Sequence, residues 1–183
     1  MKSPKSVRIA GKRLSEILER HARFVRGEEG GERAELTGAD LQGIDLTRAN
    51  LAYANFAGAN LTGACLREAK LGSADFSRAK LHKADLRRAD MTEAHFSAAD
   101  LSEALVSGVE AFRADFQDAN LRRADLGMTN FRDANVRGAN FQNARMNATI
   151  LRETNLEGAD LSGTDLSTAL LPRNFVKAGA ARG

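Results

Sequence analysis

Several residue types and sequence features are scarce or absent in this chain of 183 residues. It has no tryptophan, one tyrosine, one cysteine and two prolines. A single cysteine excludes an internal disulfide. No apolar run is long enough to cross a membrane, and the basic start MKSPKSVRIAGKRL has no apolar stretch long enough for a secretory signal. We therefore expect a cytoplasmic protein without a membrane-spanning segment.

Motifs of catalysis and of metal binding are missing as well. The sequence shows no phosphate-binding loop, no Cys/His cluster at metal-ligand spacing and no strand–turn–helix nucleophile motif. Its three histidines, His21, His82 and His95, are scattered. We expect no enzymatic activity, no cofactor and no bound metal.

What the chain does contain is a short, strict repeat. From Leu36 to Leu171, without an insertion, every fifth residue is large and apolar except Ala111, and the residue two before it is almost always alanine. The units read A(D/N)LXX, as in ADLQG, ANLTG and ADFSR. A helix repeats near 3.6 residues and a strand at 2, so a strict period of 5 predicts an all-β solenoid. The Asp or Asn before each central residue belongs to the repeat and should point outward, so these carboxylates do not indicate an active site.

A second, longer period gives the number of sides. Phenylalanine is central in every fourth unit at Phe56, Phe76, Phe96 and Phe116, which predicts coils of four faces and a continuous stack of rings. The repeats make about seven such coils, a rod roughly 34 Å long at the usual spacing of strands. Threonines occupy the small inward slot near the C-terminal end, and their buried hydroxyls would need backbone partners (Thr129, Thr149, Thr154 and Thr164).

These residues closely resemble the pentapeptide repeat family over about three quarters of the chain. The resemblance implies a right-handed quadrilateral β-helix, whose hand the spacing itself does not show. Some relatives inhibit DNA gyrase and confer quinolone resistance through acidic rods that resemble a DNA duplex. Residues 34–173 hold 19 acidic and 16 basic side chains, too few net negative charges for such a mimic.

The segments outside the repeats differ in composition. Residues 1–33 form an N-terminal extension in which apolar residues recur at helical spacing between about Gly11 and Arg26, and Gly27 follows as a stop signal. We expect an α-helix that caps the first coil. The nine basic and five acidic residues of this extension leave open an alternative, a helix that binds a membrane surface or nucleic acid. Residues 174–183 form a C-terminal tail.

One corner of the predicted rod is basic. Folding the chain into four-sided coils aligns Arg48, Arg67, Arg87 and Arg88 there. They form either part of a solvated surface of mixed sign or a docking patch for an acidic protein partner. Nucleic acid is disfavoured because no aromatic residues interleave with the arginines.

An apolar patch is predicted at the C-terminal end. Ile150 and Leu170 replace the usual outward Asp or Asn, stack one above the other, and are followed by Leu171, Phe175 and Val176. This surface needs a cover, either the tail itself or a second copy of the chain, as in the gyrase-inhibiting relatives. We expect a homodimer through this end.

Ala111 and Cys65 also depart from the repeat. In EALVSGVEAF, Ala111 stands where a large residue belongs, and we expect the coil to bulge so that Phe112 fills the space; the alternative is exposure of the apolar residues for binding. Cys65 occupies an outward slot and is expected to be a surface thiol without a role.

The sequence thus predicts a rigid, non-catalytic scaffold or protein-interaction module. A gyrase or topoisomerase modulator and a membrane-surface adaptor remain alternatives, which a supercoiling assay and liposome binding would distinguish.

Overall fold

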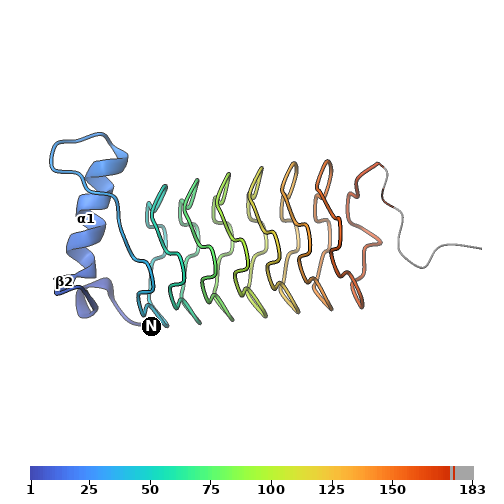
Figure 1. The fold of residues 1–183 in the computed structure, drawn as a ribbon. Helices are drawn as coiled ribbons and strands as arrows, with labels where there is room; N and C mark the ends of the chain where they lie inside the picture. The colour runs from blue at the N-terminus through green and yellow to red at the C-terminus, as the bar shows by residue number, and fades with distance from the viewer. Residues whose placement is uncertain (174, 176–183) are drawn as a thin grey trace, which may run out of the picture.

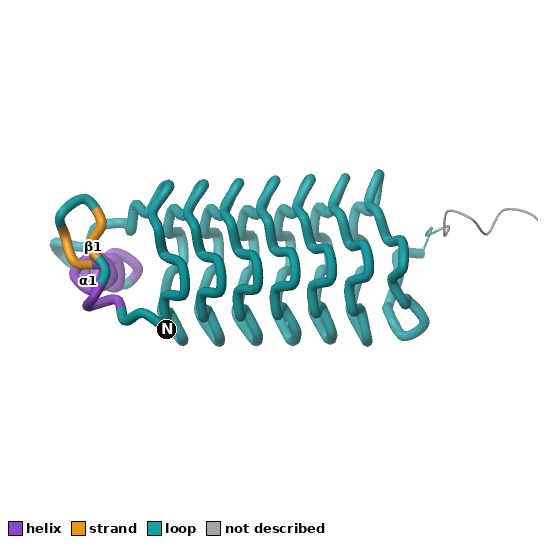
Figure 2. Tube along the Cα trace, turned by 90° about the horizontal axis from the view of Figure 1, so that it is seen from below, coloured by secondary structure: helices purple, strands orange, loops and turns teal. Residues whose placement is uncertain are grey.

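The protein is a rod of stacked coils with one α-helix lying across its N-terminal end (Figure 1). The computed structural model describes residues 1–173 and 175. Ahead of the coils lie the 3-10 helix η1 (Pro4–Ser6), the strands β1 (Arg8–Ile9) and β2 (Lys12–Arg13), and the helix α1 (Leu14–Val25). The described residues after α1 form short bridges and turns, drawn as loop in Figure 2.

Parallel bridges hold successive coils together. Each joins residues 20 positions apart, from Glu35 with Asn55 to Ile150 with Leu170. At each bridge, one backbone N–H points to the previous coil and the next points to the following one. The N–H of Asp75 donates to the carbonyl of Ala54 at 2.9 Å, and the N–H of Phe76 donates to the carbonyl of His95 at 2.7 Å. This constant offset is the pairing expected of four-sided coils.

The phenylalanine column is continuous, as predicted. Ring centroids of Phe56, Phe76, Phe96 and Phe116 are separated by 4.7, 4.8 and 4.8 Å, with planes within 4° of parallel. The rings therefore follow the spacing of the backbone ladder itself. Beyond Phe116 the packing changes, and Phe131 meets it edge-on at 5.3 Å.

The outward Asp and Asn residues hold the corners of the coils. Every Asp or Asn in that slot accepts a hydrogen bond from the backbone N–H two residues later, as Asp75 does from Ser77 at 2.8 Å. This Asx turn satisfies an amide that the ladder leaves free. Positive φ follows at the next residue, as at Gly38 (65°) and Arg48 (58°), which explains the recurrent glycine there. The repeated carboxylates are thus structural.

The inward threonines have the backbone partners that the sequence analysis required. The hydroxyls of Thr129, Thr149, Thr154 and Thr164 donate to carbonyls one coil earlier, at 2.7, 2.8, 2.7 and 2.8 Å. Because each hydroxyl is paired within the rod, threonine substitutes for alanine without an unsatisfied buried group.

The expected bulge at Ala111 is wrong. The ladder is uninterrupted there, with bridges from Glu110 to Asp90 and to Asn130, and Ala111 is fully buried in its regular slot. Phe112 lies on the surface, half-buried, with the Arg113 guanidinium 4.8 Å from its ring centroid. Backbone hydrogen bonds to both neighbouring coils fix the register of this coil. They stabilise the regular arrangement more than filling the space beside Ala111 with Phe112 would.

The N-terminal end of the rod is covered by sequence that does not repeat. Lys2 forms a parallel bridge with Ile44 and so adds a short edge to the first coil. From α1, Leu14 and His21 are fully buried, while Ile17 and Leu18 pack half-buried against the core. The amphipathic face of the helix is therefore occupied by the rod.

The helix is shorter than the range expected for it. It spans Leu14–Val25 because Arg8–Ile9 and Lys12–Arg13 instead pair as a short hairpin through Ala10 and Gly11, both at positive φ. Gly27, at φ 69°, follows its end. Gly31 lies so close to α1 that a Cβ there would overlap the Phe24 backbone nitrogen.

Candidate functional site

The structure brings together three of the four arginines assigned to the basic corner. Bridges between Asp45 and Cys65, and between Cys65 and Asp85, set three coils in register. The arginines follow two or three residues later in each coil, at the turns. Arg67, Arg87 and Arg88 line one hollow, and Arg48 stands one coil away from it.

Two of these arginines are already paired. Arg48 Nε lies 2.9 Å from Glu68 Oε2, and Arg87 makes two hydrogen bonds to Asp85, at 2.9 and 2.7 Å. Burial opposes the charge of Asp85, but the side-chain and backbone hydrogen bonds from Arg87 outweigh it and hold the pKa of Asp85 below its ordinary value. The hydrogen bond from Arg48 likewise lowers the pKa of Glu68. These carboxylates stay charged at neutral pH and neutralise their partners.

Arg67 and Arg88 are different. Both are exposed, and neither forms an ion pair within the part of the chain that the structure describes, residues 1–173 and 175. Both are close enough to Glu68 to contribute to its lowered pKa, after the larger effect of Arg48. The free donors of the corner therefore belong to these two residues.

The hollow between them has a volume of about 300 Å³. It exists because the turn of one coil carries almost no side chain there, since its residues are Ser107 and Gly108. A larger side chain rises on each side. Arg88 bounds the hollow on one side, and Met128, 68% exposed, bounds it on the other.

Cys65 is not the surface thiol expected from its slot. It is 6% exposed, and its Sγ lies 3.1 Å from the Thr47 hydroxyl. The Thr47 side chain, one coil earlier, therefore lies directly against the thiol.

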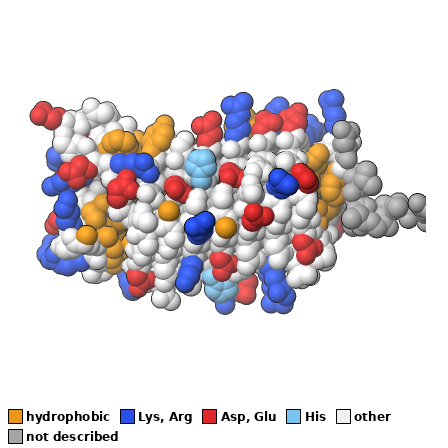
Figure 3. All heavy atoms as spheres, viewed as in Figure 1, with side chains coloured by type: hydrophobic (Ala, Val, Ile, Leu, Met, Phe, Trp, Pro, Cys, Tyr) orange, Lys and Arg blue, Asp and Glu red, His pale blue; other side chains and the backbone are white. Residues whose placement is uncertain are grey.

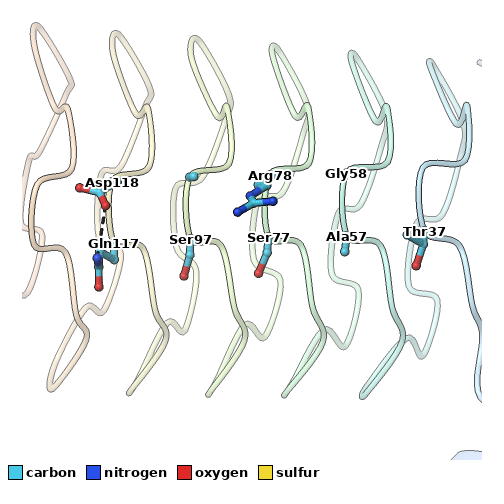
Figure 4. Close-up of a pocket in the computed structure, with 9 residues that line it drawn as sticks. Thr37, Ala57, Gly58, Ser77, Arg78, Ser97, Gln117 and Asp118 are labelled. Carbon is cyan, nitrogen blue, oxygen red and sulfur yellow. Dashed lines mark hydrogen bonds between the residues drawn. The ribbon is translucent and has the colours of Figure 1, made fainter.

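A second, wider groove runs along a different corner (Figure 4). Its volume is about 630 Å³, and small side chains such as Ala57, Gly58, Ser77 and Ser97 line most of it. Arg78 is its only cation, and Gln117 and Asp118 close one end through a 3.2 Å hydrogen bond. The groove follows from small turn residues and gathers no set of groups that could bind one ligand.

The structure describes four of the five residues assigned to the C-terminal patch. Ile150 and Leu170 form a bridge, and Leu170 is 43% exposed. Leu171 and Phe175 are half-buried and pack against the core. Val176, the fifth residue assigned to this patch, lies outside the described residues.

Charges of both signs are interspersed on the surface, as the face in Figure 3 shows. The described residues contain no group of three or more His, Cys, Asp or Glu side chains placed to hold a metal ion. No helix in the same part of the chain has the length and apolar character needed to cross a membrane.

Comparison with known proteins identifies a family model that matches the repeats. A family model described as pentapeptide repeats matches residues 32–67, 69–108, 89–127 and 129–167, in eight copies. No curated protein matches the chain in sequence.

Solved structures of pentapeptide repeat proteins are similar to parts of the chain. HetL from the cyanobacterium Nostoc sp. strain PCC 7120, involved in heterocyst differentiation regulation, is 24% identical over 78% of each chain, with a TM-score of 0.24. QnrB1, a plasmid-mediated fluoroquinolone resistance protein, is 21% identical over 76% of this chain and 73% of its own, with a TM-score of 0.38. Another pentapeptide repeat protein from Nostoc PCC 7120 is 38% identical over 56% of this chain and 77% of its own, with a TM-score of 0.29.

These TM-scores are low, so the family model is the finding that assigns the chain. Its matches cover well over half of the residues, and the regular parallel bridges between coils agree with the solenoid that such repeats form. Family membership implies the right-handed quadrilateral type of β-helix. The chain belongs to the pentapeptide repeat family.

Proposed function

We propose that the protein is a non-catalytic, rigid scaffold that binds a protein partner through the side of its rod. One observation carries this proposal: every outward Asp and Asn is engaged in an Asx turn, whereas Arg67 and Arg88 on one corner have no ionic partner in the described chain. The ladder makes the rod stiff, so residues on separate coils keep fixed spacings. Such a surface presents a pattern to a partner at little cost in conformational entropy.

The proposed organisation has three parts. Residues 1–33 cap the rod, residues 34–173 form about seven four-sided coils, and residues 174–183 form the tail. The proposed location is the cytoplasm. In this proposal no residue has a catalytic role.

Gyrase or topoisomerase modulation is the alternative that family resemblance suggests. QnrB1 is a fluoroquinolone resistance protein, but the likeness to it is weak. The rod here has nearly balanced charge, arranged in bands of basic and acidic residues along its length, which does not suit a duplex mimic. On our proposal, stoichiometric amounts of this protein leave supercoiling by purified gyrase unchanged.

A membrane adaptor is disfavoured by the position of α1. A helix that binds a membrane surface needs its apolar face free. Here Leu14 and His21 are fully buried in the rod, and Ile17 and Leu18 pack against it.

We further propose a homodimer through the C-terminal end. The exposed Leu170 beside the half-buried Ile150 and Leu171 leaves apolar surface that the described part of the chain does not cover. Phe175 packs back on its own core and so belongs to the cover of its own subunit.

Cross-linking in cells tests the scaffold function. The intact protein is compared with a double variant at the candidate corner, Arg67→Glu with Arg88→Glu, and with a matched double variant on another corner, Arg122→Glu with Arg123→Glu. We expect one protein to be captured by the wild type and the control and to be lost with the first variant. If both variants retain every captured protein, the corner is not a docking surface and the proposal is wrong.

A further inference from the structure

We propose that the hollow between Arg88 and Met128 binds an acidic segment of a partner protein in which a carboxylate side chain lies beside an apolar one. This inference rests on the proposed scaffold function and specifies the chemistry of the partner. The inference depends on Arg67 and Arg88, which form no ion pair in the described chain, and on the exposed Met128. Between them the hollow is lined by the small residues Ser107 and Gly108.

The arginines select a carboxylate. Arg67 and Arg88 project from consecutive coils, so their guanidinium groups can hold one acidic side chain between them. An arginine presents a planar fork of N–H donors that matches the two oxygens of a carboxylate. Arg87 already shows this arrangement in the same hollow, with two hydrogen bonds to Asp85.

The charge of the corner limits how strong an anion it can take. The four arginines are accompanied by four carboxylates, so the corner as a whole carries no excess charge (Arg48, Arg67, Arg87 and Arg88; Asp45, Glu68, Asp85 and Asp125). Arg48 and Arg87 are held by Glu68 and Asp85, so the free donors of Arg67 and Arg88 suit one further carboxylate. A phosphate dianion or a nucleic-acid backbone would meet the retained charges of Glu68 and Asp85.

The far side of the hollow is apolar. Met128 is 68% exposed, and its unbranched side chain adapts to the shape of an apolar neighbour. Leu105, 36% exposed, lies two residues before Ser107 and replaces an outward Asp between Asp85 and Asp125. Met128 is thus the exposed apolar side chain that lines the hollow opposite Arg88, and Leu105 lies in the coil between them.

The floor between these walls depends on glycine. Gly108 has a φ of 68°, and a Cβ placed there would lie 3.6 Å from Arg88 Cγ. A longer side chain at this position would fill the space beside the Arg88 stem. The glycine therefore keeps the floor open for an apolar side chain of the partner next to the bound carboxylate.

Peptide binding to the full-length protein tests the proposal. The methyl carbon of methionine is labelled with ¹³C, and the Met128 signal is followed by NMR. The probe is a capped pentapeptide of sequence Gly-Asp-Leu-Asp-Gly. Three comparison ligands are the same peptide with Asn for Asp, the same peptide with Gly for Leu, and inorganic phosphate.

We expect saturable shifts of the Met128 methyl with the first peptide. Arg88→Gln should weaken this binding by about tenfold, as the loss of a charge-assisted hydrogen bond does. Met128→Ser, followed through backbone amides, should weaken it several-fold. Arg123→Gln is the matched control, because Arg123 occupies the same turn position on another corner, with φ 57° against 60° for Arg88. This variant should bind like the wild type.

Several results would overturn the proposal. These are no shift up to millimolar peptide, equal binding of the Asn peptide or the Gly peptide, and a stronger response to phosphate than to the acidic peptide. If the peptide fails but partner capture still depends on Arg67 and Arg88, the scaffold function stands and only this occupant is wrong. If the peptide binds but capture is independent of those arginines, the scaffold proposal is the one that fails.

Discussion

The two ends of the rod differ in how well they cover the core residues of their terminal coils. At the N-terminal end, the core residues of the first coil, such as Leu36 and Leu41, are fully buried. At the C-terminal end, Leu156 and Leu161 hold the same central slots in the last coil but are only half-buried, and Leu170 is 43% exposed. The repeat is equally regular at both ends, so the difference comes from the segments that flank it.

The N-terminal flank supplies the hydrogen-bond acceptors and the apolar side chain that a preceding coil would otherwise provide to the first coil. The Lys2 carbonyl accepts the N–H of Asp45 at 2.9 Å, and His21 Nδ1 accepts the N–H of Ala34 at 3.1 Å. Leu14 supplies the apolar side chain that another coil would provide. At the other end, no described residue accepts the N–H groups of Leu156 and Leu161. A repeat that ends without such groups leaves an edge open for pairing or for a second subunit.

The largest effect should come from the cap itself. Leu14 is fully buried between α1 and the first coil, so Leu14→Ala creates a cavity that costs about 2–5 kcal/mol. The same truncation at Leu170 removes a partly exposed side chain and should cost less than about 1 kcal/mol in the monomer. Urea unfolding of both variants, followed by circular dichroism, measures the difference. Equal losses would show that the two ends are equally sealed.

A substitution at the C-terminal end should change self-association more than it changes the stability of the monomer. Leu170→Glu places a charge in the proposed dimer contact and should weaken association by more than about tenfold. Phe24→Glu, at a residue 39% exposed on α1, is the control and should leave association unchanged. Analytical ultracentrifugation measures the mass. A wild type that stays monomeric well above micromolar concentration would contradict the dimer.

The covered end should be the acid-sensitive one. Burial lowers the pKa of His21 from 6.5; the backbone of Ala52 opposes this shift, and the charge of Arg33 adds to it. Since the folded protein binds the proton more weakly than the unfolded chain, the stability from His21 is complete above pH 6.5 and falls as the pH drops through the lowered pKa. Protonation would also abolish the acceptor for the Ala34 N–H.

Hydrogen exchange measures this pH dependence at single amides. Exchange of the Ala34 amide should accelerate, relative to its intrinsic rate, as the pH falls below about 6.5. Amides of the central coils should show no such change. A His21→Asn variant should exchange faster at every pH and lose the dependence. An Ala34 amide whose protection is constant from pH 7 to 5 would rule out the histidine.

Much of the rod could be predicted because the repeat determines position directly. A period of 5 within a period of 20 assigns each inward residue to a face and a coil, so the stack from Phe56 to Phe116 follows from spacing alone. The same regularity misled at Ala111, where one small residue suggested a bulge. The ladder has bonds on both sides of each coil, and one cavity does not break it.

The site was only partly predictable because it depends on side-chain choices. The repeat places Arg48, Arg67, Arg87 and Arg88 on one corner, but it does not say which of them pair with Glu68 or Asp85. Exposed ion pairs contribute about 0–1 kcal/mol, so small differences in local geometry select among them. The hollow itself had a signal in the sequence, the small turn residues Ser107 and Gly108 between turns that carry Arg88 and Met128.

The smallest expected effect is the loss of stability when an outward Asn becomes Asp, which should differ between an interior coil and the last one. Within the rod, an Asn that follows an acid one coil earlier donates its amide to that carboxylate, as Asn120 does to Asp100 at 3.0 Å. Asn120→Asp removes this bond and sets two like charges about 4.8 Å apart, which should cost about 1 kcal/mol. Asn155→Asp is the matched control, because the residue below it is Asn135 and the substitution keeps the Asx turn.

Thermal unfolding at low and high salt measures both variants. Only Asn120→Asp should lower the melting temperature, and added salt should recover part of the loss because it screens the new repulsion. If Asn155→Asp is equally destabilising, the cost belongs to the turn rather than to the neighbouring coil. In that case repulsion between outward charges of neighbouring coils would be negligible, and the interior coils and the last coil would differ in burial alone.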